Sequence, residues 1–230
     1  MHIHGLQKLT LLDFPGHTAC TVFTGACNFR CPFCHNASLV LQPEAQPLLP
    51  EAELFAFLEK RKKLLDGVAV TGGEPTLQPD LPDFLRRVRD MGYAVKLDTN
   101  GGRPEVLRDI LEAGLADYVA MDIKSSPAHY AQAAGVSGIL DAVRESVELL
   151  RHSGIPHEFR TTAVKPLHTE DDFRAIGEWL SGEERYFIQS YTDSGDILAP
   201  GMEAFSNAEL HRLLDAVRLR LPSAELRGVD

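Results

Sequence analysis

The sequence predicts an α/β protein that is built around a parallel β-sheet. Short runs of apolar and β-branched residues alternate with longer segments whose apolar residues recur at the helical period of about 3.6 residues. In addition, the stretches that are richest in reactive side chains follow the C-terminal ends of the expected strands, which is where βα folds place their active sites. Six such units are compatible with an open doubly wound sheet and with an incomplete barrel.

Six runs have the length and composition of strands: Ala19–Thr24, Val68–Thr71, Ala94–Asp98, Tyr118–Asp122, His157–Thr162 and Tyr186–Gln189. Each is followed by an apolar helical stripe, over Leu54–Leu65, Leu81–Val88, Val106–Leu111, Ile139–Leu150, Phe173–Leu180 and Leu210–Leu221. We expect one domain over residues 1–230, with an N-terminal extension (1–18), a βα core (19–191) and a C-terminal loop and helix (192–230).

The composition excludes several classes of protein. A net charge of −10 over 230 residues argues against a general affinity for nucleic acid, which needs a positive surface. No run approaches the roughly 18 consecutive apolar residues of a membrane span, and Met1–Gly16 lacks the apolar core of a secretory signal. The cysteines form no even disulfide framework, since three are clustered and Cys20 stands apart. We therefore expect a cytoplasmic protein with no membrane or nucleic-acid partner.

The clustered cysteines, Cys27, Cys31 and Cys34, indicate a metal centre, because thiolates suit iron–sulfur clusters and zinc. A structural zinc site takes four ligands, for which His35 is the only near candidate, and a redox dithiol needs only a pair. Three thiolates favour a cluster in which one iron has no protein ligand and is open to chemistry, since ordinary clusters take four cysteines. Cys20 lies in the first expected strand and is expected to be a small buried apolar residue.

Polar segments follow the other expected strands: Thr71–Pro75, Asp98–Gly101, Asp122–Lys124, Arg160–Lys165 and Gln189–Tyr191. The carboxyl ends of parallel strands share one edge, so these segments are expected to gather there. Core packing does not account for this recurrence, which favours an enzyme.

The spacing Cys-x3-Cys-x2-Cys, with Phe33 before the last cysteine, together with the segment Gly72-Gly73-Glu74, resembles the radical S-adenosylmethionine (radical SAM) superfamily. The resemblance implies a full or partial parallel βα barrel, so the expected fold is a partial (βα)6 barrel, an incomplete TIM barrel. It also implies one 4Fe–4S cluster on the three cysteines. The open iron of that cluster binds S-adenosyl-L-methionine (SAM), which one-electron reduction cleaves to a 5′-deoxyadenosyl radical.

Five segments narrow the resemblance: Lys8–Gly16, CNFRCPFCHN, TGGEPTLQ, LDTNG and DIK. Together they resemble glycyl-radical-enzyme activating proteins, most of all those of anaerobic ribonucleoside-triphosphate reductase, from about Leu6 to Tyr191. The resemblance implies that a backbone glycine of a partner enzyme loses a hydrogen atom and becomes a glycyl radical. It also implies an outside electron donor, flavodoxin or ferredoxin. Ala37 stands where many such proteins have proline, a difference of little functional weight.

The resemblance implies cofactor contacts after the second expected strand. A carbonyl of Gly72 or Gly73 would accept a hydrogen bond from the SAM ammonium, because glycine lets the backbone approach a ligand closely. Glu74 would be a further acceptor or, alternatively, a helix N-terminal carboxylate. Phe33 belongs to the cofactor-binding part of the cysteine motif.

The resemblance also implies that residues at the ends of two later strands bind the cofactor. Asp122 and Lys124 would hold the ribose and the methionine carboxylate. One residue separates them, so they face the same side of a strand, and an internal salt bridge is the alternative. Asp98 and Thr99 match residues of related activating proteins that contact the cofactor or a monovalent cation, although the following Asn100-Gly101 pair is also typical of an ordinary turn.

The roles of five other polar residues are predicted less specifically. His35 and Asn36 either cap the next helix or lie beside the cluster. Arg160, His168 and Gln189 are expected to be satisfied polar residues. With one spare cysteine, the chain offers no second all-cysteine cluster.

Two further functions stay open at this point. The same radical chemistry could act on a small molecule or a modified nucleoside, or the chain could be a non-catalytic iron–sulfur or zinc protein. Ser190–Ser206, which is rich in Gly, Pro and Asp, follows the last expected strand. From its position we expect it to border the open side of the barrel and to dock the partner.

Overall fold

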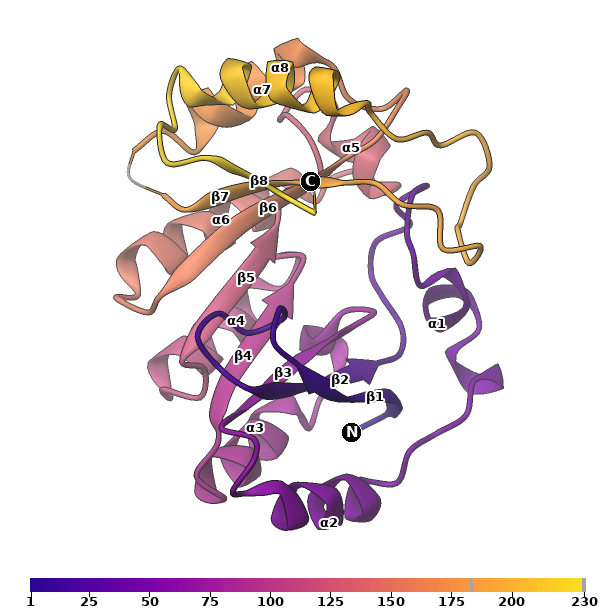
Figure 1. The fold of residues 1–230 in the computed structure, drawn as a ribbon, viewed down its shortest axis with the longest axis vertical. Coiled ribbons are helices and arrows are strands. Elements are labelled where there is room, and N and C mark those ends of the chain that lie inside the picture. Colours follow the sequence, from indigo (N-terminus) through magenta and orange to yellow (C-terminus); the bar gives the residue numbers. More distant parts are fainter. Residues whose placement is uncertain (183, 229–230) are drawn as a thin grey trace. The chain divides into compact units, whose positions relative to one another are not determined.

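A computed structural model describes residues 1–182 and 184–228 of the chain (Figure 1). The chain forms two compact units, each assembled from separate segments of sequence. The first unit consists of Met1–Asn28, Ser38–Ala120 and Ala142–Pro156, and the second of Phe29–Ala37, Met121–Asp141 and His157–Asp230.

The first unit carries the N-terminal strands and the helices that follow them. Its strands are β1 (Ile3–Thr10), β2 (Ala19–Thr24), β3 (Gly67–Gly72) and β4 (Ala94–Thr99). Its helices are α2 (Glu51–Arg61), α3 (Leu81–Asp90) and α4 (Pro104–Glu112), the short 3-10 turns η1 (Pro43–Ala45) and η2 (Pro75–Leu77), and nearly all of α1 (Ala37–Leu41) and α6 (Leu140–His152). β5 (Tyr118–Asp122) begins in this unit and ends in the second.

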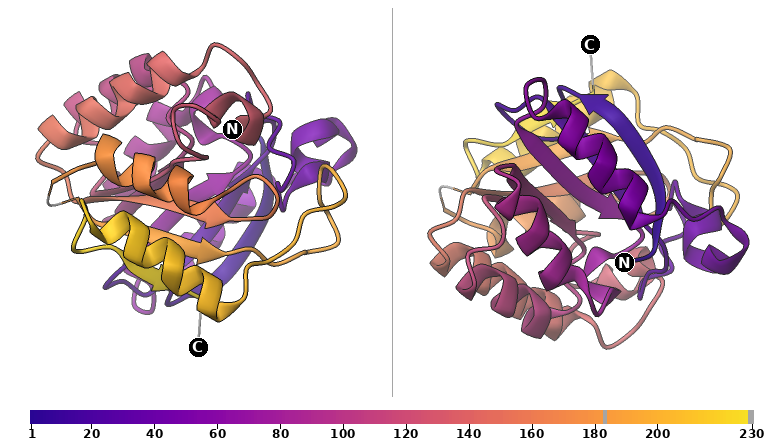
Figure 2. Two further views of the ribbon diagram at one scale, coloured as in Figure 1. Left: turned by 90° about the horizontal axis from the view of Figure 1, so that it is seen from above. Right: turned by 90° about the horizontal axis from the view of Figure 1, so that it is seen from below.

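The second unit contains the end of β5 and the C-terminal elements. These are α5 (Tyr130–Ala134), β6 (His157–Ala163), α7 (Glu170–Trp179), β7 (Tyr186–Ser190), α8 (Asn207–Arg218) and β8 (Glu225–Arg227). Helices α7 and α8 lie side by side (Figures 1 and 2). They approach closely at Gly177, where an added Cβ would meet the carbonyl oxygen of Val217 at 2.9 Å.

Strand order in the sheet follows chain order, from β1 to β8. In the first unit β1 is antiparallel to β2, whereas β2, β3 and β4 are parallel neighbours. In the second unit β6, β7 and β8 are parallel neighbours. Parallel strands need covered faces, and the central residues of the strands, such as Val70, Leu97 and Ile188, are accordingly fully buried. This arrangement confirms the expected α/β class of an incomplete parallel barrel.

The six predicted strands are all present, with ends that differ by one residue at most. The structure adds β1 in the segment expected to be an N-terminal extension, and β8 after the strand that was expected to be the last. It also adds the five-residue helices α1 and α5. No helix in residues 1–182 and 184–228 has both the length and the apolar character that crossing a membrane requires.

Candidate metal and cofactor site

The three motif cysteines follow β2 and are divided between the units. Cys27 belongs to the first unit, and Cys31 and Cys34 belong to the second. Among the described residues, none of the three forms a disulfide, and neither does Cys20, which is fully buried as expected. Burial raises the pKa of the Cys20 thiol to about 12, so it behaves as a small apolar side chain.

In the first unit, Cys27 faces the loop that follows β4. Its Sγ lies 3.6 Å from Asn100 Nδ2, which donates toward it. The same Nδ2 donates to Asn28 Oδ1 at 2.8 Å. The LDTNG segment supported the family resemblance, but no contact was predicted for the Asn100 side chain, so this contact is a site feature that the pattern did not reveal.

Glu74 joins two loops of the first unit through a fully buried carboxylate. Its Oε1 accepts hydrogen bonds from the Thr76 backbone N (3.1 Å), from Thr76 Oγ1 (2.6 Å) and from Thr99 Oγ1 (2.8 Å). Its Oε2 accepts from the Asn100 backbone N at 2.7 Å. Burial raises the pKa of this carboxyl group, and the hydrogen bonds oppose that rise. The alternative expectation, a carboxylate at a helix N-terminus, is confirmed at η2, and a contact of Glu74 with the cofactor stays a prediction.

The glycines after β3 permit a close backbone approach within the first unit. Gly72 has a φ of 118°, a conformation that L-residues rarely adopt. An added Cβ at Gly73 would overlap the carbonyl oxygen of Ala26, and Glu74 N donates to that same oxygen at 2.7 Å. The Gly72-Gly73-Glu74 segment is therefore packed directly against the chain that leads into Cys27.

Asp98 is paired with a lysine in its own strand. The ammonium of Lys96, whose side chain is 1% exposed, forms an ion pair and hydrogen bond with Asp98 Oδ1. A buried ammonium needs such a partner, because desolvating an unpaired charge is costly. The negative charge of Asp98 is therefore already balanced inside the first unit, and its contact with a cofactor or a cation stays a prediction.

In the second unit, Cys31 is held against helix α5. Its Sγ lies 3.8 Å from the Ala134 carbonyl oxygen, which also accepts from the Arg30 backbone N at 2.8 Å. The loop turns tightly between its two cysteines, where Cys34 N donates to Cys31 O at 3.0 Å. Burial raises the pKa of the Cys31 thiol to about 11, so the thiol is protonated near neutral pH, and a metal would have to displace this proton to bind the sulfur.

Asp122 and Lys124 lie at the end of β5 and form the internal salt bridge considered above. Lys124 Nζ is 3.0 Å from Asp122 Oδ2, and Arg160 Nε donates to Asp122 Oδ1 at 2.9 Å. Burial alone would raise the pKa of Asp122, but Arg160 and Lys124 hold it well below its usual range. Burial likewise opposes the charge on Lys124, whose pKa is nevertheless raised, chiefly by Asp122. The Asp122 and Lys124 side chains are still 33% and 17% exposed, so both are accessible to a ligand.

His168 supports the backbone of this strand end. Its Nδ1 accepts from the Val164 backbone N at 3.1 Å, which places the proton on Nε2, and Nε2 donates to the Lys124 carbonyl oxygen at 2.8 Å. The buried ring of Phe33 meets the imidazole edge-on at 6.1 Å. His168 is thus a satisfied polar residue, as the sequence suggested, and Gln189 lies in β7.

Tyr130 brings a buried hydroxyl group near Lys124 in the second unit. The residue is 1% exposed, and its Oη has no hydrogen-bond partner of good geometry among the described residues. Burial raises the pKa of Tyr130, while Lys124 lowers it. A buried hydroxyl group without a well-placed partner costs stability. Neither the strand pattern nor the DIK motif pointed to it.

The segment after β7 lies along the cysteine loop within the second unit. Hydrogen bonds join the two segments, among them Ser194 Oγ to His35 O (3.2 Å), Ala37 N to Asp196 O (3.2 Å) and Ala199 N to Pro32 O (2.9 Å). The ring of His35 stacks on Tyr191 at 5.4 Å. Part of Ser190–Ser206 is therefore fixed beside the cysteines, while its role in docking stays a prediction.

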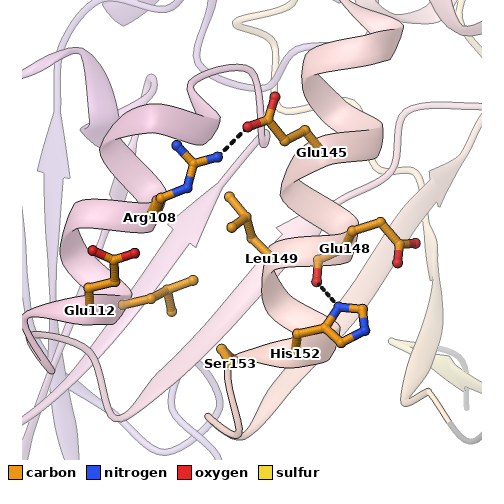
Figure 3. Close-up of a pocket in the computed structure, with 8 residues that line it drawn as sticks. Arg108, Glu112, Glu145, Glu148, Leu149, His152 and Ser153 are labelled. Atoms are coloured by element: carbon orange, nitrogen blue, oxygen red, sulfur yellow. Dashed lines mark hydrogen bonds and ion pairs between the residues drawn. The ribbon is translucent and has the colours of Figure 1, made fainter.

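A separate cavity of about 460 Å³ lies between α4 and α6 in the first unit (Figure 3). An ion pair between Arg108 and Glu145 spans it, and Leu149 lies between the helices. None of the predicted site residues lines this cavity.

The side chains present suit an iron–sulfur cluster by their chemistry. Both units contain motif cysteines, and in the first unit an amide N–H faces a sulfur, as hydrogen-bond donors do around cluster thiolates. Within residues 1–182 and 184–228, no group of three or more His, Cys, Asp or Glu side chains converges as ligands of a single metal ion.

The family follows from a comparison with known proteins. Residues 21–180 match the model of the Radical SAM superfamily, and the chain belongs to this superfamily. Membership implies an enzyme that binds a 4Fe–4S cluster and SAM. The sequence-based resemblance to the superfamily is thereby confirmed.

The curated relatives indicate a branch of the family. The chain is 29% identical over 194 residues to a putative glycyl-radical enzyme activating enzyme of Methanocaldococcus jannaschii. This alignment covers 82% of this chain and 79% of that relative. It is 34% identical over 127 residues to the pyruvate formate-lyase-activating enzyme of Clostridium pasteurianum, over 53% of this chain and 52% of that one. It is also 31% identical over 147 residues to a probable GTP 3′,8-cyclase of Thermococcus kodakarensis, over 63% and 47% of the two chains.

Solved structures share the fold. The SuiB protein of Streptococcus suis, in a crystal structure with bound SAM, has a TM-score of 0.68 at 16% identity, over 89% of this chain and 49% of that chain. Methylornithine synthase has a TM-score of 0.65 at 15% identity, over 90% of this chain and 63% of that chain. The chain thus spans about half to two thirds of the length of these structures, and the likeness concerns the fold alone.

We predict that Glu74→Gln destabilises the protein without cluster or SAM by about 1–3 kcal/mol, because an amide NH2 would then face one of the N–H or O–H donors. Urea denaturation measures this. Glu105→Gln, which alters a 57% exposed carboxylate paired with Arg103, is the matched control and is expected to change the free energy of unfolding by less than about 0.5 kcal/mol. Equal stabilities of Glu74→Gln and the parent would contradict the structural role of the carboxylate.

We also predict that acid destabilises the fold partly through His168. Burial lowers the pKa of His168 below the ordinary value of 6.5. The nearby His129 lowers this pKa further, whereas the negative charge of Asp172 raises it. The unfolded chain then binds the proton more tightly, so this contribution to stability is present above pH 6.5 and is lost as the pH falls toward the folded-state pKa. Urea denaturation between pH 7 and pH 5 should give a shallower pH dependence for His168→Asn than for the parent, by up to about 1.4 kcal/mol per pH unit. Identical dependences would show that His168 does not contribute.

Proposed function

We propose that this chain is a radical SAM activating enzyme that forms a glycyl radical on a partner enzyme, with anaerobic ribonucleoside-triphosphate reductase as the partner. The supporting observation is the similarity over 194 residues to a relative named as a glycyl-radical enzyme activating enzyme, across 79% of that relative. The reductase is proposed as partner because Lys8–Gly16, CNFRCPFCHN, TGGEPTLQ, LDTNG and DIK, taken together, most resemble the activating proteins of that enzyme. We place the reaction in the anaerobic, reducing cytoplasm, with flavodoxin or ferredoxin as electron donor.

The chain's residues divide the work in this proposal. Cys27, Cys31 and Cys34 hold a single 4Fe–4S cluster, since Cys20 is buried and stands apart in β2. When bound, the cluster and SAM supply the 5′-deoxyadenosyl radical. Phe33, which is 4% exposed, keeps water from the cysteine loop.

Further residues orient SAM. A carbonyl of the Gly72-Gly73 segment accepts from the SAM ammonium, with Glu74, Asp98 and Thr99 behind it. Lys124 holds the methionine carboxylate and Asp122 the ribose. Arg160 keeps Asp122 ionised, which suits an acceptor for ribose hydroxyl groups.

A second candidate acts on a small molecule or nucleotide. It is favoured by the 31% identity to a probable GTP 3′,8-cyclase, although that match covers only 47% of the relative. Both candidates use the same cluster chemistry, so the substrate distinguishes them.

We predict a glycyl-radical doublet in the electron paramagnetic resonance (EPR) spectrum when the reconstituted protein, reduced flavodoxin, SAM and the reductase are mixed without oxygen. Cys34→Ala should remove the doublet, because a cluster ligand is lost. Cys20→Ala, the matched control, should keep it. SAM cleavage without a doublet, together with consumption of a nucleotide, would contradict the activating role and support the second candidate.

A further inference from the structure

Asn100 directly follows β4, is 5% exposed and has a fixed side-chain orientation. Its Oδ1 accepts from the Gly102 backbone N at 2.8 Å, and its Nδ2 donates to Asn28 Oδ1 at 2.8 Å. Rotating the amide by 180° would set NH2 against the Gly102 N–H and oxygen against oxygen at Asn28. The hydrogen-bond network therefore assigns the NH2 group to the side of Cys27, where Nδ2 lies 3.6 Å from Sγ.

The backbone that carries Asn100 is equally fixed within the first unit. Its N donates to Glu74 Oε2 at 2.7 Å, and the next peptide is held by Gly101 N to Thr99 Oγ1 (3.1 Å) and by Ser146 Oγ to Gly101 O (2.7 Å). The amide thus needs no rearrangement to face the sulfur. A preorganised donor of this kind loses little entropy when the sulfur becomes more negative.

We propose that Asn100 is a positioning residue that raises the reduction potential of the cluster by donating a hydrogen bond to the Cys27 thiolate. This inference rests on the proposed function in one respect, the ligation of the cluster by Cys27. An N–H donor stabilises added negative charge on sulfur, and hydrogen bonds to cluster sulfurs raise the potential. A higher potential makes reduction by flavodoxin or ferredoxin easier. The loop after β4 thereby acts on the electron transfer, a role that differs from a contact with SAM.

The test is a potentiometric titration of the reconstituted cluster without SAM, followed by EPR. Asn100→Asp keeps the acceptor for Gly102 N, removes the donor and adds a negative charge, so the ratio of reduced to oxidised cluster at a fixed potential should fall about tenfold, or 59 mV for one electron. Asn100→Ala removes the donor without adding a charge, so it should lower the ratio of reduced to oxidised cluster by a smaller factor. Asn207→Asp, an exposed asparagine at the start of α8, is the matched control and should leave the ratio unchanged.

A second readout separates tuning from loss of structure. Iron and sulfide content should match the parent in Asn100→Ala, and pulsed EPR in D2O should lose the coupling to one exchangeable deuteron. A ratio within twofold of the parent in both Asn100 variants would overturn the proposal. This test is separate from that of the proposed function. A shifted potential without a glycyl radical would support the role of Asn100 and contradict the proposed function. A glycyl radical with unshifted potentials would support the proposed function and contradict the role of Asn100.

Discussion

The buried carboxylate of Glu74 is the interaction on which the first unit's share of the site depends. A carboxylate without water needs donors around it, and Glu74 finds them in Thr76 of its own turn and in Thr99 and Asn100 after β4. The same Asn100 contacts Cys27 through its side chain. One buried charge therefore links the Gly-Gly-Glu segment, the loop after β4 and a predicted cluster ligand into a rigid frame.

In the second unit, a carboxylate is stabilised by positively charged side chains. Asp122 is flanked by Lys124 and Arg160, so the carboxylate stays ionised although desolvation favours its neutral form. Because the aspartate and lysine side chains keep some exposure, the pair presents both signs of charge to a ligand. SAM carries an ammonium, a carboxylate and a sulfonium, so such a surface suits it better than a single charge would. The buried hydroxyl group of Tyr130 lies near the same lysine.

The sequence predicted the parallel strands well because buried strands need continuous apolar, β-branched runs, as in Ala19–Thr24. It missed β1, where Gly5, Gln7 and Lys8 interrupt the pattern, and β8, which has three residues. In the site, the cysteines are identified by local spacing. Asn100 resembled a turn residue because an Asn-Gly pair is typical of turns. Its contact with Cys27 was missed because the two residues lie 73 positions apart, and such a contact is not visible in a single sequence.

The proposed function requires that the polypeptide leave one iron of the cluster for SAM to bind. Mössbauer spectroscopy of protein reconstituted with 57Fe can show whether it does. We expect SAM to shift the signal of a single iron toward values typical of nitrogen and oxygen ligands. Four sulfur-ligated irons that do not respond to SAM would contradict it.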